Sequence, residues 1–444
     1  MTPTRITVAL FVAERYWADA NERDAAIATA RAVIGKLLSP LGLSEGEVQA
    51  VTVQELADLE QIQGPGGLAI LVPMSGAVQP WMEEAAASFE ALYIVPGYME
   101  AIFPRQVALR ALELNSAPAS MDLYAVLKRG ELPVHLVRTP EELVARVRAW
   151  RGVQALRGSK LLMVGKPEPW VISVSRRYAD YESTFGIELE TVGHEQLKAR
   201  FDAIERSAAE ARAEEYLSSA TELVEPTADA VIEASRLVLA VEELMEETGA
   251  LGLAVACFNL ISVLGTTSCL TVSMLNDSDR WIGACEGDLD SALTLMLVKT
   301  VTGKPGWIAN PNLQRDETVN FVHCTAALRL GGSPHAYRLR SHHESGTGVS
   351  PEVELPTNEQ VSLVRFGMKE GKLTIQRGRA LTPAREPSCR TQLRVDLGEV
   401  DEYLNNVLGC HQVIVYGDVR KELSYAAELL GIEVTETGYQ LSPA

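Results

Sequence analysis

Short apolar runs that end at a chain breaker alternate with longer helical stretches through the first half of the chain. This pattern limits the choice of fold more than any other feature. Three such runs cover residues 6–12, 68–73 and 92–97. A helical pattern at 24–38 separates the first run from the second. Alternation of this kind predicts parallel strands with helices on both faces of the sheet.

A second unit of the same type is expected after a helix at 141–150 and a basic stretch at 151–160 that indicates a linker. Its first strand is Leu161–Gly165, and another is expected at 187–192. Residues 227–247 predict its longest helix, whose apolar positions form a face that packs in the core.

After about residue 330, turns multiply and short β-like runs appear. These runs cover residues 360–366, 372–376, 392–395 and 412–416. A chain of 444 residues exceeds the size of a single core, so several domains are expected. The prediction is two Rossmann-like, doubly wound α/β domains followed by a β-rich C-terminal domain. The expected boundaries are 1–155, 156–330 and 331–444.

The charge balance excludes several classes of partner. There are 40 basic and 59 acidic residues, which give a net charge of −19. Such a surface repels phosphate backbones, so nucleic acid and anionic membranes are not expected partners. The sequence shows neither a long apolar membrane segment nor a signal-peptide pattern, and a cytoplasmic protein is expected. The six cysteines form no C-x-x-C pair, which argues against a zinc finger.

The motif Cys285-Glu286-Gly287-Asp288 places two carboxylates between a strand-like segment and an apolar helical segment at 291–300. Ligands of open α/β sheets bind at such carboxyl ends of strands. Glu286 and Asp288 could therefore hold a divalent metal or move protons. Asp288 taken alone is explained as a helix N-cap, so both interpretations stay open.

Histidines concentrate in the second half of the chain, where five of the seven lie between His323 and His411. His323 closes an apolar run and is expected at a strand end. His343 and Glu344 lead into a glycine-rich turn, where backbone can approach a ligand closely. His411 precedes a further strand. Each histidine is a candidate metal ligand or substrate contact, and each alone is also explained as a packed or surface residue.

The pair Arg176-Arg177, which follows Trp170, is a candidate grip for an anionic group, although an exposed basic pair is the simpler interpretation. The sequence contains no phosphate-binding loop, no G-x-G-x-x-G after a strand, no H-E-x-x-H and no G-x-S-x-G. The acidic and histidine motifs are therefore the main candidates for chemistry.

Together these motifs resemble the L-fucose isomerase and L-arabinose isomerase superfamily, and more narrowly the shorter fucose-isomerase-like proteins. The resemblance covers about residues 255–420. It rests on Cys285–Asp288, on His323-Cys324, on His343–Gly346 and on residues 409–418, which are similar to the family's Gly-Asn-His-His loop. It implies a metal-dependent aldose–ketose isomerase, usually with Mn²⁺, that acts on a small sugar and forms homo-oligomers such as trimers or hexamers.

The resemblance also implies roles for individual residues. Asp288 matches the family's metal-binding carboxylate that also moves protons, and His411 matches its metal-binding histidine. With Glu286 as second ligand or partner base, the expected metal ligands are Glu286, Asp288 and His411. The expected catalytic residues are Asp288 and Glu286. The expected substrate contacts are His323, His343 and Glu344.

Two features depart from the family's pattern. Its other acidic ligand lies roughly two dozen residues before the Asp288 position, but Asn259–Ser273 contains no Asp, Glu or His. Cys410 and Gln412 replace the asparagine and the second histidine of the loop. Two alternatives therefore stay open, a metal-free or non-catalytic sugar-binding or regulatory protein, and a related lyase or epimerase.

Overall fold

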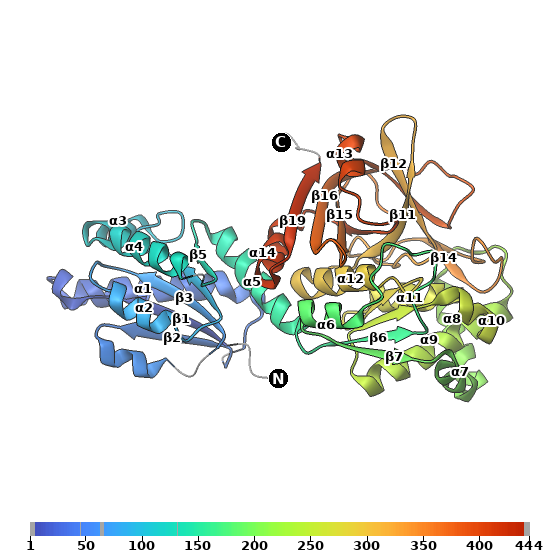
Figure 1. Ribbon diagram of the computed structural model, residues 1–444, viewed down its shortest axis with the longest axis horizontal. Helices are drawn as coiled ribbons and strands as arrows, with labels where there is room; N and C mark the ends of the chain where they lie inside the picture. Colours follow the sequence, from blue (N-terminus) through green and yellow to red (C-terminus); the bar gives the residue numbers. More distant parts are fainter. Residues whose placement is uncertain (1–4, 45, 63–65, 131, 439–444) are drawn as a thin grey trace. The chain divides into compact units, whose positions relative to one another are not determined.

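The structure is a computed structural model that describes residues 5–44, 46–62, 66–130 and 132–438. The chain forms two compact units, Met1–Arg151 and Gly152–Ala444. They run from blue to teal and from green to red in Figure 1.

The first unit contains a five-stranded parallel sheet. Its strands are β1 (Ile6–Phe11), β2 (Val48–Val53), β3 (Leu68–Pro73), β4 (Ala91–Ile94) and β5 (Val134–Leu136). Its helices are α1 (Ala20–Leu38), α2 (Gln79–Ala86), α3 (Arg105–Glu113), α4 (Ser116–Arg129) and α5 (Pro140–Leu156), the last of which continues into the second unit. The strand order β2-β1-β3-β4-β5 is that of a doubly wound sheet. Every residue of β1, β3 and β4 is buried, as expected for strands covered on both faces.

The second unit begins with a four-stranded parallel sheet in the order β10-β9-β6-β7. Its strands are β6 (Lys160–Val164), β7 (Glu188–Val192), β9 (Gly252–Val255) and β10 (Ile282–Ala284). Its helices are α6 (Tyr178–Phe185), α7 (His194–Ala203), α8 (Arg206–Ser219), α9 (Ala228–Thr248), α10 (Cys257–Leu264), α11 (Cys269–Asp277) and α12 (Leu289–Thr302). The longest helix, α9, starts at the Thr227 cap and ends at Gly249, which adopts the left-handed conformation.

The rest of the second unit is built around an antiparallel barrel. Its strands are β11 (Trp307–Leu313), β12 (Thr318–His323), β15 (Gln360–Gly367), β16 (Lys372–Leu381), β17 (Thr391–Asp396) and β18 (Gln412–Tyr416). The order β15-β18-β11-β12-β17-β16 closes through the β15–β16 pairing, and β19 (Glu433–Gly438) adds to β16 in parallel. The remaining elements are β8 (Glu222–Leu223), β13 (Tyr337–Arg340), β14 (Ser350–Val353), α13 (Val400–Asn405) and α14 (Arg420–Leu430).

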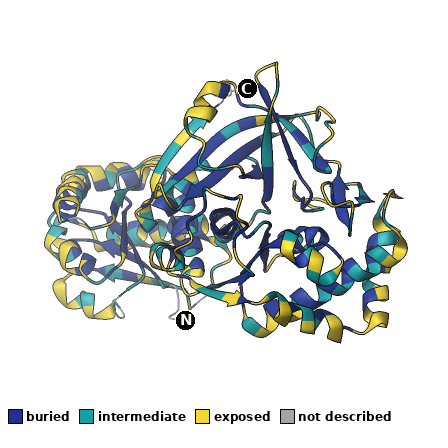
Figure 2. Cartoon of the chain, turned by 45° about the vertical axis from the view of Figure 1, so that its right-hand side comes forward, coloured by how far each residue is buried: buried dark blue, intermediate teal, exposed yellow. Residues whose placement is uncertain are grey.

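Helix α12 lies between the parallel sheet and the barrel of the second unit. It packs against β9 and β10 of the sheet and against β15 and β18 of the barrel. All but a few of its residues are buried. Figure 2 shows barrel strands that are largely buried, whereas outer helices alternate buried and exposed stretches. The first turn of α12 therefore lies where loops of the sheet and strands of the barrel can meet.

The mixed α/β class with a β-rich C-terminal part is confirmed, and two details differ from the sequence analysis. No linker spans 151–160, because α5 continues to Leu156 and β6 begins at Lys160. Val153 and Leu156 are buried and extend the apolar face of the helix. The barrel also takes β11 and β12 from residues before 331. Among the described residues no single helix is long and apolar enough to cross a membrane, and α10 with α11 meets that test only as a pair bent by 120°.

Candidate metal centre

Glu286 lies in a tight turn between β10 and α12. Its φ is +57° and that of Gly287 is +63°, so two consecutive residues adopt the left-handed conformation. A Cβ on Gly287 would lie 2.7 Å from the Cα of Pro167, which makes glycine necessary at this position. The strained backbone at Glu286 is typical of a residue held in place for function.

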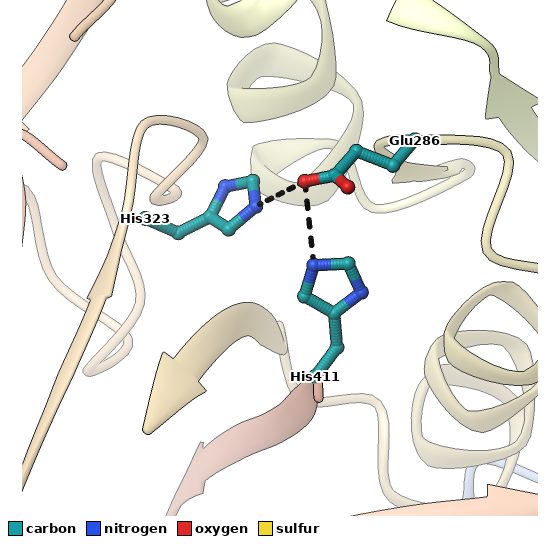
Figure 3. Close-up of side chains that lie close together, drawn as sticks. All are labelled: Glu286, His323 and His411. Atoms are coloured by element: carbon teal, nitrogen blue, oxygen red, sulfur yellow. Dashed lines mark ion pairs between the residues drawn. The ribbon is translucent and has the colours of Figure 1, made fainter. Parts of the chain in front are cut away.

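Two histidines from the barrel meet this carboxylate (Figure 3). His323 is the last residue of β12, and His411 directly precedes β18. Oε1 of Glu286 lies 3.7 Å from Nε2 of His323 and 3.4 Å from Nε2 of His411. One ligand atom from each residue lies within 4.8 Å of the other two. We call Glu286, His323 and His411 the metal triad.

Nδ1 of each imidazole has a hydrogen-bond partner in the protein, and this contact orients both Nε2 atoms toward Glu286. Nδ1 of His411 lies 2.8 Å from Oδ2 of Asp288, and Nδ1 of His323 lies 3.0 Å from the hydroxyl of Thr325. Histidines that ligate metals characteristically use their other ring nitrogen in this way. Two imidazoles and a carboxylate form a donor set that suits divalent transition metals.

Glu286 and His411 shift the pKa values of one another. Burial alone would raise the pKa of Glu286, but His323 and His411 hold it well below its usual range. Burial alone would lower the pKa of His411, but the carboxylates of Asp288 and Glu286 raise it well above its usual value. The carboxylate therefore stays ionised, and a metal ion bound by His411 would have to displace a proton from its imidazole.

Asp288 lies behind His411 and is not part of the triad. Its Oδ1 accepts the N–H of Ser291 at 2.8 Å, so it is the N-cap of α12. Its Oδ2 accepts from Nη1 of Arg365 at 2.8 Å as well as from His411. The side chain is fully buried. Both oxygens are thus occupied by protein groups.

Arg365 of β15 is the charged centre of this buried network. Besides Asp288, its guanidinium contacts the hydroxyl of Ser291 at 2.5 Å and Oδ2 of Asp290 at 3.4 Å. The hydroxyl of Tyr181 donates to Oδ1 of Asp290 at 2.6 Å. Burial and the neighbouring Asp288 raise the pKa of Asp290 to about 6. The sequence analysis does not predict these partners, although an arginine within the apolar run 360–366 is a signal of a buried charge.

A loop after β6 covers the other side of Glu286. The indole N–H of Trp170 donates to Oε2 of Glu286 at 2.8 Å. The ring of Trp170 packs edge-on against Phe258 at 5.0 Å, and Phe258 packs in the same way on His342 at 5.6 Å. Arg176 holds the loop by donating to the carbonyl oxygens of residues 167, 168 and 171. These contacts form an aromatic wall beside the triad.

Glu168 is a second buried carboxylate beside this group. Its backbone N–H donates to the carbonyl oxygen of Glu286 at 3.1 Å, and its Oε1 accepts the N–H of Phe258 at 3.1 Å. Burial raises its pKa. The stretch Asn259–Ser273 lacks the acid that the family resemblance would place there. Glu168 follows β6, and its carboxylate contacts the first turn of α10, close to the start of that stretch.

The roles of His323, His343 and Glu344 as substrate contacts stay predictions. His323, expected as a substrate contact, is a member of the triad. His343 and Glu344 lie in the turn between β13 and β14 and are not in the triad. His343 is half-buried and Glu344 is exposed. Their neighbour His342 makes the aromatic contact instead.

Comparison with known proteins identifies one similar enzyme. No protein-family model matches the chain. A sulfoquinovose isomerase from Clostridium sp. (strain MSTE9) is 27% identical over 265 residues. The match covers 56% of this chain and 58% of that enzyme. The chain is therefore similar to this enzyme over little more than half the length of each protein.

Proposed function

We propose that this protein is a metal-dependent aldose–ketose isomerase that acts on a sugar. The observation that carries the proposal is the metal triad, in which two imidazoles with fixed outer nitrogens face one ionised carboxylate. The similarity to a sulfoquinovose isomerase supports the reaction class. Mn²⁺ as the cation, a cytoplasmic location and a homo-oligomeric assembly are parts of the same proposal.

Glu286, His323 and His411 would hold the cation through Oε1 and the two Nε2 atoms. A divalent cation at such a site polarises a sugar carbonyl and stabilises the negative charge that develops on adjacent oxygens. Trp170 leaves Oε1 of Glu286 free for the cation, because its indole N–H occupies Oε2.

Interconversion of an aldose and a ketose through an enediolate moves a proton between two neighbouring carbons, and a carboxylate close to both can act as the general base. We propose Glu168, whose pKa is raised by burial, as the carboxylate that carries this proton, because the cation and Trp170 occupy both oxygens of Glu286. Asp288 is enclosed by Ser291, Arg365 and His411 and has no exposed surface. We therefore propose that Asp288 orients His411, in place of the ligand and proton carrier that the family resemblance implies.

The direct test is turnover in deuterated water. The Mn²⁺-loaded protein is incubated with sulfoquinovose, and the sugar is followed by NMR. We expect a ketose product and deuterium at the carbon next to the carbonyl. Both should disappear after chelation and return when Mn²⁺ is added back. Absence of product and of deuterium from sulfoquinovose and from a panel of neutral aldoses would contradict the isomerase proposal and favour a sugar-binding protein.

A further inference from the structure

Two pairs of thiols lie next to residues of the metal triad, and the proposed reaction uses neither pair. The thiols of Cys324 and Cys389 share a hydrogen bond. The thiol of Cys285 donates to Sγ of Cys257 at 3.2 Å. All four cysteines are free thiols. Each pair has the composition of a disulfide in its reduced form, and exposure to solvent distinguishes the two.

Of these two pairs, only Cys324 and Cys389 are open to an oxidant from solvent. Cys389 is half-buried, in the loop before β17, whereas Cys324 is buried. Cys257 and Cys285 are both buried, with exposed fractions of 5% and 4%. Cysteines that oxidise reversibly are those that solvent reaches and that have a second thiol beside them to complete a disulfide. Cys389 meets the first condition, and Cys324 supplies the second thiol.

The register of two barrel strands brings Cys324 and Cys389 to the same end of the barrel. Strands β12 and β17 are antiparallel neighbours, and His323 of β12 pairs with Thr391 of β17. Cys324 directly follows the first of these residues, and Cys389 precedes the second by two positions. The pair is therefore built by the same strand end that presents His323 to the metal triad.

Cys324 also lies between a triad residue and the group that orients it. His323 precedes it, and Thr325, whose hydroxyl lies 3.0 Å from Nδ1 of His323, follows it. A disulfide brings its two sulfur atoms to about 2.0 Å, much closer than two hydrogen-bonded thiols. Formation of the bond therefore draws Cys324 toward Cys389 and disturbs the contact that fixes the imidazole.

We infer that Cys324 and Cys389 are an oxidation site at which a peroxide forms a disulfide, and that this disulfide weakens the binding of a divalent cation by the metal triad. The disulfide does not depend on the isomerase proposal, whereas its effect on the cation rests on the metal triad.

The chemistry takes two steps. The peroxide first transfers an oxygen to the sulfur of Cys389, so that an S–O bond forms, the O–O bond breaks and one water leaves. The sulfur of Cys324 then displaces this oxygen, which leaves as a second water with the proton of the Cys324 thiol while the S–S bond forms. In total two thiols lose two electrons, and one peroxide is reduced to two waters. A dithiol reductant reverses the change.

The experiment treats the whole chain, freed of metal, with hydrogen peroxide in the presence of a chelator. After both reagents have been removed, peptide mass spectrometry identifies each disulfide, and a titration with Mn²⁺ gives the affinity. The variant Cys389→Ser cannot form the bond but keeps Cys324 and the exposed Cys410. The matched control Cys257→Ser breaks the buried pair instead. An untreated sample of each protein is the reference.

We expect a disulfide between Cys324 and Cys389 in the oxidised wild type and in oxidised Cys257→Ser. Their Mn²⁺ affinity should fall about tenfold or more, as when a ligating histidine loses its outer contact, and dithiothreitol should restore it. The affinity of Cys389→Ser should change by less than about twofold on oxidation, because the contact between His323 and Thr325 is kept.

Absence of this disulfide, a disulfide confined to Cys257 and Cys285, or a disulfide without loss of affinity would overturn the inference. An equal fall of affinity in oxidised Cys389→Ser would also overturn it, because oxidation elsewhere would then be the cause. Reduced wild type that binds no Mn²⁺ would contradict the metal triad and this inference together. Failure of the isomerase proposal alone would be recognised separately, as an unchanged sugar in the presence of bound Mn²⁺.

Discussion

Nδ1 of His411 lies 2.8 Å from Oδ2 of Asp288, and this contact joins the metal triad to a charged network inside the protein. The same oxygen accepts from Arg365, whose side chain is fully buried. Three elements far apart in the sequence, the start of α12, β15 and the residue before β18, thus determine how one imidazole is oriented. The position of His411 depends on the barrel and on the parallel sheet together.

Replacing Asp288 by asparagine tests this relationship. The shape and the cap of α12 are largely kept, but the fixed orientation of His411 is weakened. Loss of such an outer contact typically reduces metal affinity 10- to 100-fold, and we expect a decrease of about this size in a Mn²⁺ titration. The control is Asp290→Asn, since Asp290 contacts Arg365 but not His411. A loss of metal as complete as in His411→Ala would instead make Asp288 a ligand, as the family resemblance implies.

Arg365→Met should destabilise the protein strongly. The substitution keeps most of the side-chain volume but leaves Asp288 buried without its charged partner. Breaking a buried ion pair from one side costs about 3–5 kcal/mol, and we expect a loss of this order in the free energy of unfolding from urea denaturation. Arg379→Met, at an exposed position, should stay within about 0.5 kcal/mol of the wild type. Equal stabilities of the two variants would refute the role given to Arg365.

Trp170→Phe removes the indole N–H while keeping an aromatic ring against Phe258. Oε2 of Glu286 then loses its partner, and the carboxylate becomes less fixed. A hydrogen bond to a charged group contributes about 1.5–3 kcal/mol, which corresponds to a Mn²⁺ affinity at least tenfold weaker. Trp81→Phe in the first unit is the matched control. An unchanged affinity in Trp170→Phe would show that this contact does not position Glu286.

Asp277 should give the protein a measurable pH dependence of stability. Burial raises its pKa to about 6 from the ordinary 3.8, even though the N–H groups of Leu328 and Arg329 donate to it. The folded state therefore binds this proton more tightly than the unfolded state. The resulting stability is complete below pH 3.8 and is lost as the pH rises through about 6, with a total of about 3 kcal/mol.

The measurement for Asp277 is the free energy of unfolding of the wild type and of Asp277→Asn at pH 4.5 and pH 7. The variant loses hydrogen bonding at both pH values, so the informative quantity is the change between them. We expect the wild type to lose more stability over this interval than the variant. Parallel pH dependences would mean that Asp277 titrates normally.

The sequence predicted those parts of the structure that depend on local pattern. Residues 6–12 and 68–73 predict strands from sequence alone because β1 and β3 are fully buried and continuously apolar. The edge strand β2, half-exposed, and the three-residue β5 lack such a run and were missed. Helix α5 was predicted to end too early because its basic residues suggested a linker.

For the candidate site, the sequence predicts which residues take part better than it predicts how they contact one another. Glu286 and His411 were identified because they stand beside strand ends, and His323 was found but was expected as a substrate contact. No local pattern indicates that Asp288 lies behind His411, since that depends on Arg365, 77 residues along the chain. Trp170 and Glu168 reach the triad from a loop more than a hundred residues before Glu286, a relationship that only the fold creates.

Metal content tests the central claim most directly. Wild type, His323→Ala, His411→Ala and the control His335→Ala would be saturated with Mn²⁺, freed of excess metal by gel filtration and measured by elemental mass spectrometry. We predict about one ion per chain in the wild type and in His335→Ala, and none in the two triad variants, because each loses one of three protein ligands. A wild type without metal, or triad variants that retain it fully, would contradict the assignment of Glu286, His323 and His411 as the metal centre.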